Sequence, residues 1–442
     1  MRRPANHRPH AETAERPLAW GMTRYQWTVF AAAWLGWGFD VFDGLLFNFV
    51  APVCVPRLLG IAPGDPAGAA RVTAVTGTVT AALLVGWATG GILFGFVTDR
   101  LGRSRTLLIT MLTYAGATAA CALAPDIWTL AALRFVASLG IGGEWAAGAS
   151  LVAEVVPERR RVAAGALLYT SAPFGIMLAG LMNDLFTKRL HAVAANPDLA
   201  WRLVFVSGLF PALVALWVRR RVREPEAWVA AAAAPPIRVL FAPAYRRATL
   251  GGLTLSLLTL LTWWPTNAFL PFVVKHLTGP GADAAAVAGN LTYANALFNL
   301  GGLLGTIATI PLAHLGRRTM FACYFAGGAA AQWVTFGLDW APFTRLTLLF
   351  FNGLTIFGVV GAFSFYLPEL FPVRLRGTGS GFCFNTGRYL AALGPFVVGH
   401  ALGIVPTPMH AIRWVALVPL VGLAITPFIV ETHGRRVAPD PT

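Results

Sequence analysis

The chain has 442 residues, of which 56% are hydrophobic and 12% are charged, and its formal net charge is +15. A soluble domain usually has about a quarter of its residues charged, so this composition excludes an ordinary soluble protein. Apolar stretches of ~20 residues, each long enough to cross a bilayer, recur along the chain and indicate an integral membrane protein.

Residues 1–24 are polar and rich in arginine, without the apolar core of a signal peptide, and this predicts a cytoplasmic N-terminal tail. We expect a bundle of six membrane-spanning helices over 25–218, a linker over 219–247, a second six-helix bundle over 248–430 and a cytoplasmic tail over 431–442. The twelve spans are expected at 27–50, 73–97, 106–124, 127–152, 162–186, 201–218, 248–274, 288–312, 319–338, 344–367, 380–403 and 411–430.

The basic residues predict the orientation of these spans. Lys and Arg are retained on the cytoplasmic side of a membrane during insertion. Most of the 34 basic residues lie in the N-terminal tail, in the linker and in alternate loops. This asymmetry predicts an even number of spans with both termini in the cytoplasm. The basic excess therefore reports topology, and we expect no nucleic acid partner.

The cysteines and histidines form no pattern that predicts catalysis. The four cysteines lie in or beside apolar segments without the spacing of metal ligands, and the eight histidines are scattered. A membrane enzyme would need a nucleophile beside a base, or clustered metal ligands. We therefore expect neither an enzyme nor a metal site, and no cofactor other than a proton gradient as the driving force.

Two motifs of the first half of the chain recur in the second half. The matched positions are Glu154, Pro157 and Arg161 with Glu369, Pro372 and Arg376 at an offset of 215 residues, and Gly102-Arg103 with Gly316-Arg317 at an offset of 214. Duplicated six-span halves, related by a pseudo-two-fold axis, place a solute site at their interface near the middle of the membrane. This organisation favours an occluding carrier over a channel.

Three segments resemble one family of transporters. Residues 91–105, GILFGFVTDRLGRSR, resemble the signature loop between the second and third spans of the major facilitator superfamily. Residues 134–145, RFVASLGIGGEW, running on to Glu154, are similar to the fourth-span motif of its proton-coupled metabolite, aromatic-acid and sialic-acid symporters. The ETHG at 431–434 is similar to the end of the last span in its sugar and metabolite porters.

The resemblance implies alternating access, in which the two halves rock about a central site. It also implies that Asp99 locks against the start of the eleventh span, where the free N–H groups of a helix N-terminus stabilise a carboxylate. The conformational gate is expected to contain Asp99, Arg100, Gly102, Arg103, Glu154, Arg161, Glu369 and Arg376. In the second half His314 replaces the matching acid, so we expect no comparable lock there.

A few ionisable residues lie at membrane depth, where their cost suggests a function. Asp40 and Asp43 share one face of the first span, as two aspartates do in the aromatic-acid symporters that the chain resembles. Distances along the helices place Asp43 and Arg134 in the outer half of the membrane, and Glu144 and Arg388 roughly 12 Å from its inner surface. We therefore hypothesise two charge clusters, with Asp40, Asp43 and Glu144 as candidates for proton coupling. Structural ion pairs are the alternative.

Arg388 is the first candidate for binding an anionic substrate, because a buried guanidinium can hold a carboxylate through two parallel hydrogen bonds. Pairing with Glu144 alone is the alternative, and Arg134, Asn385 and Asn48 are further substrate-binding candidates. The sequence thus predicts a monomeric, multi-pass transporter of the inner (plasma) membrane that carries a small organic solute, most readily a carboxylate, with protons. A sugar or another neutral metabolite, and countertransport without protons, remain open.

Overall fold

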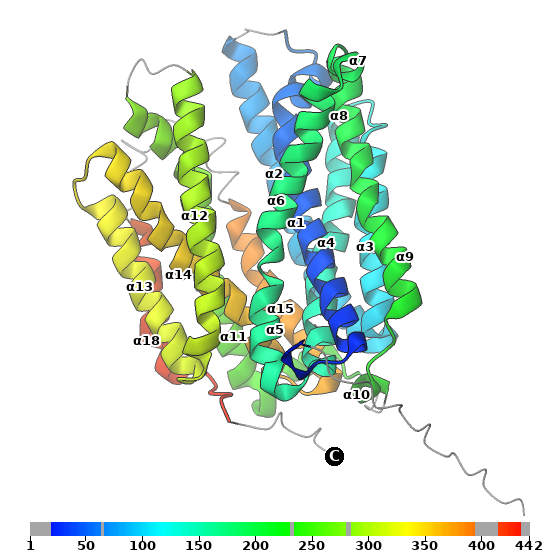
Figure 1. The fold of residues 1–442 in the computed structure, drawn as a ribbon, viewed down its shortest axis with the longest axis vertical. Helices are drawn as coiled ribbons and strands as arrows, with labels where there is room; N and C mark the ends of the chain where they lie inside the picture. Colours follow the sequence, from blue (N-terminus) through cyan, green and yellow to red (C-terminus); the bar gives the residue numbers. More distant parts are fainter. Residues whose placement is uncertain (1–18, 63–65, 230–233, 280–283, 394–413, 435–442) are drawn as a thin grey trace, which may run out of the picture.

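The computed structural model of the chain describes residues 19–62, 66–229, 234–279, 284–393 and 414–434. Within these ranges all regular secondary structure is helical. The long helices stand side by side along the vertical axis of Figure 1, and the connection between the two halves of the chain lies at the bottom. The all-α architecture expected from the sequence is therefore present.

The longer helices before the connection are α1 (Arg24–Leu58), α2 (Pro66–Leu101), α3 (Arg103–Cys121), α4 (Ile127–Val155), α5 (Glu158–Leu168), α6 (Ser171–Asp184), α8 (Pro197–Val206) and α9 (Phe210–Arg221). The longer helices after it are α11 (Pro243–Thr278), α12 (Ala284–Ala313), α13 (Arg317–Gly337), α14 (Pro342–Glu369), α15 (Arg376–Ala391) and α18 (Leu417–Ile425). The short elements are η1 (Ala19–Gly21), η2 (Leu185–Arg189), α7 (His191–Ala194), η3 (Ser207–Leu209), α10 (Glu226–Val229), η4 (Ile237–Phe241), η5 (Val373–Leu375) and η6 (Thr426–Phe428).

Seven stretches of the described chain are long and apolar enough to cross a membrane. They are Arg24–Leu58, Arg71–Leu101, Ile127–Val155, Glu158–Arg189, Pro197–Val218, Gly289–Ala313 and Pro342–Glu369. Large apolar side chains on the outside of the helices, such as Met177, Leu213 and Phe351, are exposed. A surface of this kind would be costly in water and is suited to lipid.

The helices overlap the predicted spans, and some extend beyond them, as α1 does at both ends of the predicted 27–50, whereas α3 ends at Cys121, before the predicted end at 124. The predicted fifth span is divided into two helices, α5 and α6. At the end of α5 the backbone N–H groups of Tyr169 and Thr170 donate to the backbone oxygens of Ala166 and Leu167, three residues earlier, and this tighter turn ends the α-helix. Pro173, which has no N–H, cannot continue the α5 ladder through this break. Residues 394–413, shared by the last two predicted spans, lie outside the described residues, so the count of twelve stays a prediction.

Contacts between helices define two bundles. In the first, α1, α2 and α3 pack against α4, and α6 packs against α1. In the second, α12 and α13 pack against α14, and α11 packs against α15. The first bundle ends with α9 at Arg221 and the second begins with α11 at Pro243, so the connection is shorter than the predicted linker 219–247. It contains α10 and η4.

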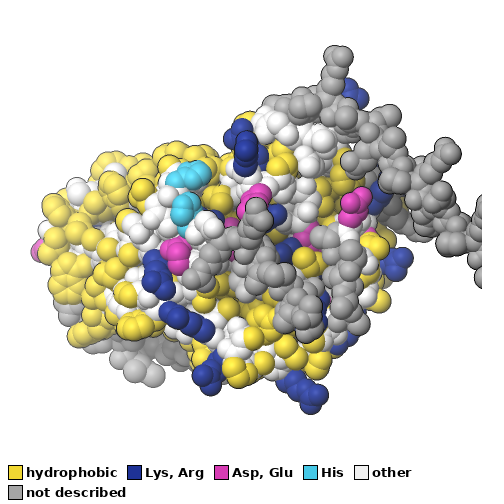
Figure 2. All heavy atoms as spheres, turned by 90° about the horizontal axis from the view of Figure 1, so that it is seen from below, with side chains coloured by type: hydrophobic (Ala, Val, Ile, Leu, Met, Phe, Trp, Pro, Cys, Tyr) yellow, Lys and Arg dark blue, Asp and Glu magenta, His cyan; other side chains and the backbone are white. Residues whose placement is uncertain are grey.

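The two bundles meet where α2 contacts α15 and where α5 contacts α12 and α14. Gly95 lets α2 and α15 approach closely, because a Cβ built there would lie only 2.6 Å from the backbone oxygen of Gly377. We call the end of the molecule that carries α10 and the α2–α3 junction the linker face. It is the lower face in Figure 1 and the face seen in Figure 2.

Candidate functional site

Asp43 and Arg134 form a closed ion pair between α1 and α4. The Arg134 Nη1 atom lies 2.9 Å from Asp43 Oδ1, and both side chains have an exposed fraction of 0%. Thr118 on α3 donates its hydroxyl to the same oxygen at 2.8 Å. Arg134 Nη2 donates to the backbone oxygen of Asp43 at 2.9 Å. The pairing predicted from helix depth is therefore confirmed.

The guanidinium of Arg134 is engaged within the first bundle in this conformation. Its Nη1 and Nη2 atoms are engaged by Asp43 and Thr118, and the residue is fully buried. A buried guanidinium held in this way stabilises the carboxylate beside it. The sequence placed Arg134 at membrane depth, but it could not show that both of its Nη atoms are engaged, while its Nε is buried without a partner among the described residues.

Asp40 and Glu144 form a second contact, between α1 and α4. Both are buried, and their side chains are close neighbours where α1 packs on α4. The carboxylate of Glu144 rests against Gly36, one turn of α1 before Asp40, where any Cβ would collide with Glu144 Oε1. Neither oxygen of Glu144 has a hydrogen-bond donor among the described residues. Two carboxyl groups in this relationship can form a hydrogen bond only if one of them carries a proton.

The hypothesised pair of Glu144 with Arg388 does not form in this structure. Arg388 donates through Nη1 to Asn385 Oδ1, one turn earlier on α15, while its Nε has no partner among the described residues. Glu144 and Arg388 were expected to pair because the helix rise places them at a similar depth. Depth along a helix, however, does not give the direction in which a side chain points.

Aromatic rings surround Arg388. Its guanidinium lies 4.7 Å from the ring centre of Trp87 on α2 and 4.5 Å from that of Phe384 on α15. Trp145 on α4 stacks on Phe384 with ring centres 4.2 Å apart. These rings were not among the residues predicted for the site. The spacing of Phe384 and Arg388, four residues apart on one helical face, was the signal that could have found one of them.

The two asparagine candidates differ in their surroundings. Asn385 is buried and orients Arg388, and its amide nitrogen donates to the backbone oxygen of Gly381 at 2.9 Å. It also packs on Gly91 of α2, so it lies at the boundary of the two bundles. Asn48 is exposed on α1, closer to the end opposite the linker face than Asp40 is. The structure thus groups Asn385 with Arg388 and leaves Asn48 apart from them.

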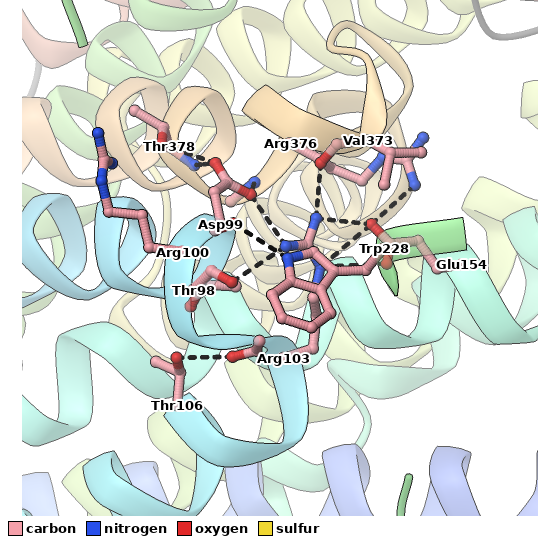
Figure 3. A network of polar contacts seen from close by, with 12 residues as sticks. Thr98, Asp99, Arg100, Arg103, Thr106, Glu154, Trp228, Val373, Arg376 and Thr378 are labelled. Carbon is pink, nitrogen blue, oxygen red and sulfur yellow. Dashed lines mark hydrogen bonds and ion pairs between the residues drawn. The ribbon is translucent and has the colours of Figure 1, made fainter. Parts of the chain in front are cut away.

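On the linker face, Asp99 at the end of α2 closes against α15. Its carboxylate accepts hydrogen bonds from the backbone N–H of Gly377 at 3.0 Å, from that of Thr378 at 2.7 Å and from the Thr378 hydroxyl at 2.7 Å. These N–H groups belong to the first turn of α15, where intrahelical acceptors are lacking. The contact that the family resemblance implied for Asp99 is therefore present (Figure 3).

Arg103 extends this contact to α4 and to the second bundle. It is completely buried and reaches Asp99 at 3.2 Å and Glu154 at 2.9 Å. Its Nη2 also donates to the backbone oxygen of Val373 at 2.6 Å. Arg376 binds the same oxygen of Glu154 at 3.0 Å, so Glu154 joins arginines from both bundles (Figure 3). A buried carboxylate between two guanidiniums is compensated only while all three remain together.

Arg100 and Gly102 have more local roles. Arg100 is exposed, with its guanidinium 3.3 Å from the ring centre of Phe96. Gly102 has a φ of +106° at the α2–α3 junction, a backbone conformation that side chains rarely adopt. A Cβ at Gly102 would also collide with the carboxylate of Glu224. The turn therefore requires glycine for two independent reasons.

The connection between the bundles takes part in the gate, which the sequence analysis did not predict. Trp228 of α10 donates its indole N–H to the backbone oxygen of Asp99 at 3.0 Å. Glu224 accepts hydrogen bonds from the first N–H groups of α3, at 2.6 Å from Arg103 N and 3.0 Å from Arg105 N. In the second half Glu431 caps α13 in the same way, at 2.9 Å from Arg317 N.

The second half repeats the lock only in part. Glu369 binds Arg317 at 2.9 Å, as Glu154 binds Arg103. Arg161, the counterpart of Arg376, forms no ion pair within the described part of the chain, and its Nε is buried without a partner. The prediction that His314 replaces Asp99 in the second half was wrong. Counting from the shared Gly-Arg pair, the buried Ala313 takes its place, and the exposed His314 corresponds to Arg100.

Comparison with known proteins decides the family of the chain. A sequence profile described as Major Facilitator Superfamily matches residues 25–395. The chain belongs to the major facilitator superfamily. It is accordingly a multi-pass transporter of the inner membrane and not an enzyme, and its two bundles are those of this transporter fold.

Relatives and solved structures agree with this assignment. The chain is 27% identical over 420 residues to the gallate transporter of Pseudomonas putida, covering 88% of this chain and 87% of the relative. It is 29% identical over 349 residues to the cis,cis-muconate transport protein of Acinetobacter baylyi, covering 74% and 78%. Among structures, XylE from E. coli, a proton:xylose symporter, matches with a TM-score of 0.74 and 17% identity, covering 93% of this chain and 98% of XylE. The likeness to XylE establishes the fold.

Proposed function

We propose that this transporter is a symporter that carries a small carboxylate together with protons, through twelve membrane spans with both termini in the cytoplasm. The observation that carries the proposal is the arrangement of Asp40, Glu144 and Arg388. These three ionisable side chains are buried, Asp40 and Glu144 between α1 and α4 and Arg388 on α15, and they lack the matched ion pair that holds Asp43 and Arg134. Unmatched charges at membrane depth are costly, so their retention indicates a task in transport.

The linker face is the cytoplasmic side in this proposal. It carries the basic connection between the bundles and the basic α2–α3 junction, which favour the cytoplasm. The contacts of Asp99 and Glu154 hold the two bundles together on this face. The structure then represents a conformation that is closed toward the cytoplasm, and release of the solute inside requires these contacts to break.

A charge count links the carboxylate to the proton. With one proton shared between Asp40 and Glu144, the acid pair has a charge of −1, which the guanidinium of Arg388 balances. A substrate carboxylate bound to Arg388 adds a further negative charge. The loaded site returns to neutrality when the second acid also takes up a proton, and burial penalises every other state. Substrate and proton would therefore cross the membrane together.

The guanidinium of Arg388 is suited to hold the carboxylate. Asn385 engages its Nη1 atom, whereas Nε has no partner among the described residues. A guanidinium that presents an unused edge can bind a carboxylate through two parallel hydrogen bonds, and Lys cannot reproduce this geometry. The relatives named for gallate and cis,cis-muconate transport carboxylates, which supports the same class of solute here. XylE supports proton symport but is named for a sugar.

Uptake into proteoliposomes with an imposed pH gradient tests the coupling. We expect Asp40→Asn and Glu144→Gln to lose accumulation of the carboxylate against its gradient and to retain exchange of substrate across the membrane. Asp43 serves as the contrast, because its ion pair predicts that Asp43→Asn acts on stability instead. Normal accumulation by both Asp40→Asn and Glu144→Gln would refute proton coupling at this pair, and uptake driven only by an exchanged solute would indicate countertransport.

The substrate class is tested by thermal stability of the purified protein. A ligand that binds the folded state raises the apparent midpoint by mass action. We expect aromatic acids and dicarboxylates to raise it and neutral sugars to leave it unchanged. Arg388→Lys is the paired variant, and it should lose the response to carboxylates. Stabilisation by a sugar, retained in Arg388→Lys, would favour the neutral-metabolite alternative.

A further inference from the structure

A cavity of about 640 Å³ opens on the linker face at the boundary between the bundles. The starts of α5 and α11, the end of α12 and the segment after α18 form its walls. Its charged lining consists mainly of arginines, Arg159, Arg160, Arg161, Arg247 and Arg317, with Glu158 and Glu369 as the acids. Figure 2 shows basic and histidine side chains together on this face. The excess of positive charge attracts an anion.

The internal repeat explains why a negative charge is missing at this place. In the first half, the last turn of α2 carries Asp99, whose carboxylate crosses to the start of α15. In the second half, α12 ends with Ala313, which has a methyl group at the corresponding position. The cavity is lined by Ile310, His314 and Arg317 on either side of Ala313, and by the start of α5 opposite. Ala313 itself is buried beside this lining, so the cavity adjoins the position that corresponds to Asp99.

Arg161 is the second indication of a missing anion. Its counterpart Arg376 binds Glu154 at 3.0 Å, together with Arg103. In the second half the corresponding acid, Glu369, is engaged by Arg317 at 2.9 Å and by the hydroxyl of Thr432 at 2.5 Å. Arg161 therefore lines the cavity without an acidic partner in the described part of the chain, and its Nε is buried.

We propose that this cavity binds a phosphate group, which supplies the negative charge that Asp99 supplies in the other half of the gate. A phosphate presents several acceptor oxygens, which match a cluster of arginines better than one carboxylate does. The group comes either from an anionic phospholipid of the cytoplasmic leaflet or from a soluble phosphate compound. Basic pockets between helices at this level of a membrane suit lipid head groups.

Bound phosphate would bridge the two bundles. Arg159 and Arg161 belong to α5 of the first bundle, whereas Arg247 and Arg317 belong to the second. The ligand therefore stabilises the conformation closed on the linker face, and separation of the bundles divides its binding site. A ligand that prefers one conformation shifts the population toward it by its difference in affinity. The cavity thus makes the position of the gate sensitive to phosphate on the cytoplasmic side.

Phosphate binding is measured through thermal stability of the full-length protein in an uncharged detergent, with chloride holding the ionic strength constant. We expect inorganic phosphate to raise the unfolding midpoint and to saturate. In the Arg159→Gln/Arg161→Gln variant the affinity should fall on the order of tenfold or more, because charge-assisted hydrogen bonds are lost. Arg105→Gln, which removes an exposed arginine of the same face outside the cavity, is the control and should bind phosphate normally.

Nanodiscs without free phosphate distinguish the two sources. Stabilisation by phosphatidylglycerol relative to phosphatidylcholine, lost in the double variant, identifies the lipid head group as the ligand. Stabilisation by inorganic phosphate in detergent identifies a soluble compound. The proposal is overturned if neither form stabilises the protein, or if the double variant responds as the unsubstituted protein does. Because stability is the readout, this result does not depend on the transported solute.

Ala313→Asp restores the missing carboxylate and tests the proposal from the other direction. This variant should be less sensitive to phosphate, because its own side chain occupies the position of the ligand. We expect its affinity for inorganic phosphate to fall on the order of tenfold from charge repulsion and competition. Unchanged phosphate affinity in Ala313→Asp would place the ligand elsewhere and contradict the proposed site.

Discussion

The Oδ2 atom of Asp99 lies 2.7 Å from the backbone nitrogen of Thr378, a residue 279 positions further along the chain. The contact joins the last turn of α2 to the first turn of α15, and thus one bundle to the other. It is compact because Gly95 and Gly377 let the two backbones approach. A contact of this kind can exist only while the linker face is closed, so its strength biases the conformational equilibrium.

Substitution of Asp99 by Asn should open the linker face. Hydrogen bonds to a charged acceptor contribute about 1.5–3 kcal/mol each, so losing the charge should shift the equilibrium at least about tenfold toward the open form. The distance between spin labels at positions 105 and 246, one on each bundle, measures this shift. Asp339→Asn is the control, because Asp339 is exposed and lies 3.5 Å from Arg345. An unchanged distance distribution in Asp99→Asn would contradict the gate.

The ion pair of Asp43 and Arg134 should behave as a structural unit. Removing one partner leaves an uncompensated buried charge, which costs about 3–5 kcal/mol. We expect Asp43→Asn and Arg134→Gln each to lower the thermal midpoint strongly. The double variant should be more stable than the sum of the two single effects predicts, since neither charge then remains. Additive losses in this double-mutant cycle would show that the two residues act independently.

Gly36 is expected to control the position of Glu144. A methyl group on Gly36 would displace the carboxylate of Glu144 from its place beside Asp40, whereas a Cβ on Gly148 would lie 3.4 Å from Glu144 Oε1 and cause little change. Gly36→Ala should therefore reduce proton-driven uptake on the order of tenfold or more, as misplacement of a functional group does, and Gly148→Ala should not. Shortening the acid by Glu144→Asp should partly restore uptake in Gly36→Ala. If both glycine variants transport equally, the contact has no role in coupling.

Because Glu431 caps α13, the free energy of unfolding should depend on pH in the acidic range. Burial disfavours the ionised form of Glu431, but the backbone N–H groups of Arg318, Arg317 and His433 and the charge of Arg317 outweigh it and hold its pKa below the usual value. A group with a lowered pKa in the folded state adds stability above its unfolded pKa of about 4.3, and this stability is lost as the pH falls through the folded pKa.

Glu431→Gln should therefore be less stable than the unsubstituted protein at neutral pH and should approach it below about pH 4. Thermal midpoints between pH 3 and 7 measure the difference. Glu226→Gln, in the exposed linker helix, provides the control for a lost surface charge. A difference between Glu431→Gln and the unsubstituted protein that stays constant across this pH range would exclude a contribution from ionisation of Glu431.

Several contacts of the site could be predicted from the sequence, because each is reflected in a local motif or in the spacing of residues along a helix. Helix rise alone placed Asp43 and Arg134 at one depth, and they pair. The resemblance of the motif around Asp99 to the family's signature loop implied the contact of Asp99 with α15, and this contact is present. His314 shows how far an internal repeat can be used to match residues. An offset that is wrong by one residue selected the exposed His314 in place of the buried Ala313 as the counterpart of Asp99.

The sequence by itself determined that this protein lies in a membrane, that its two halves are related, and that a few charged residues, Asp43 and Arg134 among them, lie at membrane depth. Apolar length, the basic asymmetry and the internal repeat are properties that can be counted along a chain. Only the tertiary structure decided that Glu144 meets Asp40 and not Arg388, that Trp228 of the linker joins the gate, and that Arg161 lacks the partner that Arg376 has. These outcomes depend on how helices rotate about their axes and which backbones approach closely. Packing between distant segments sets both quantities, and no local pattern encodes them.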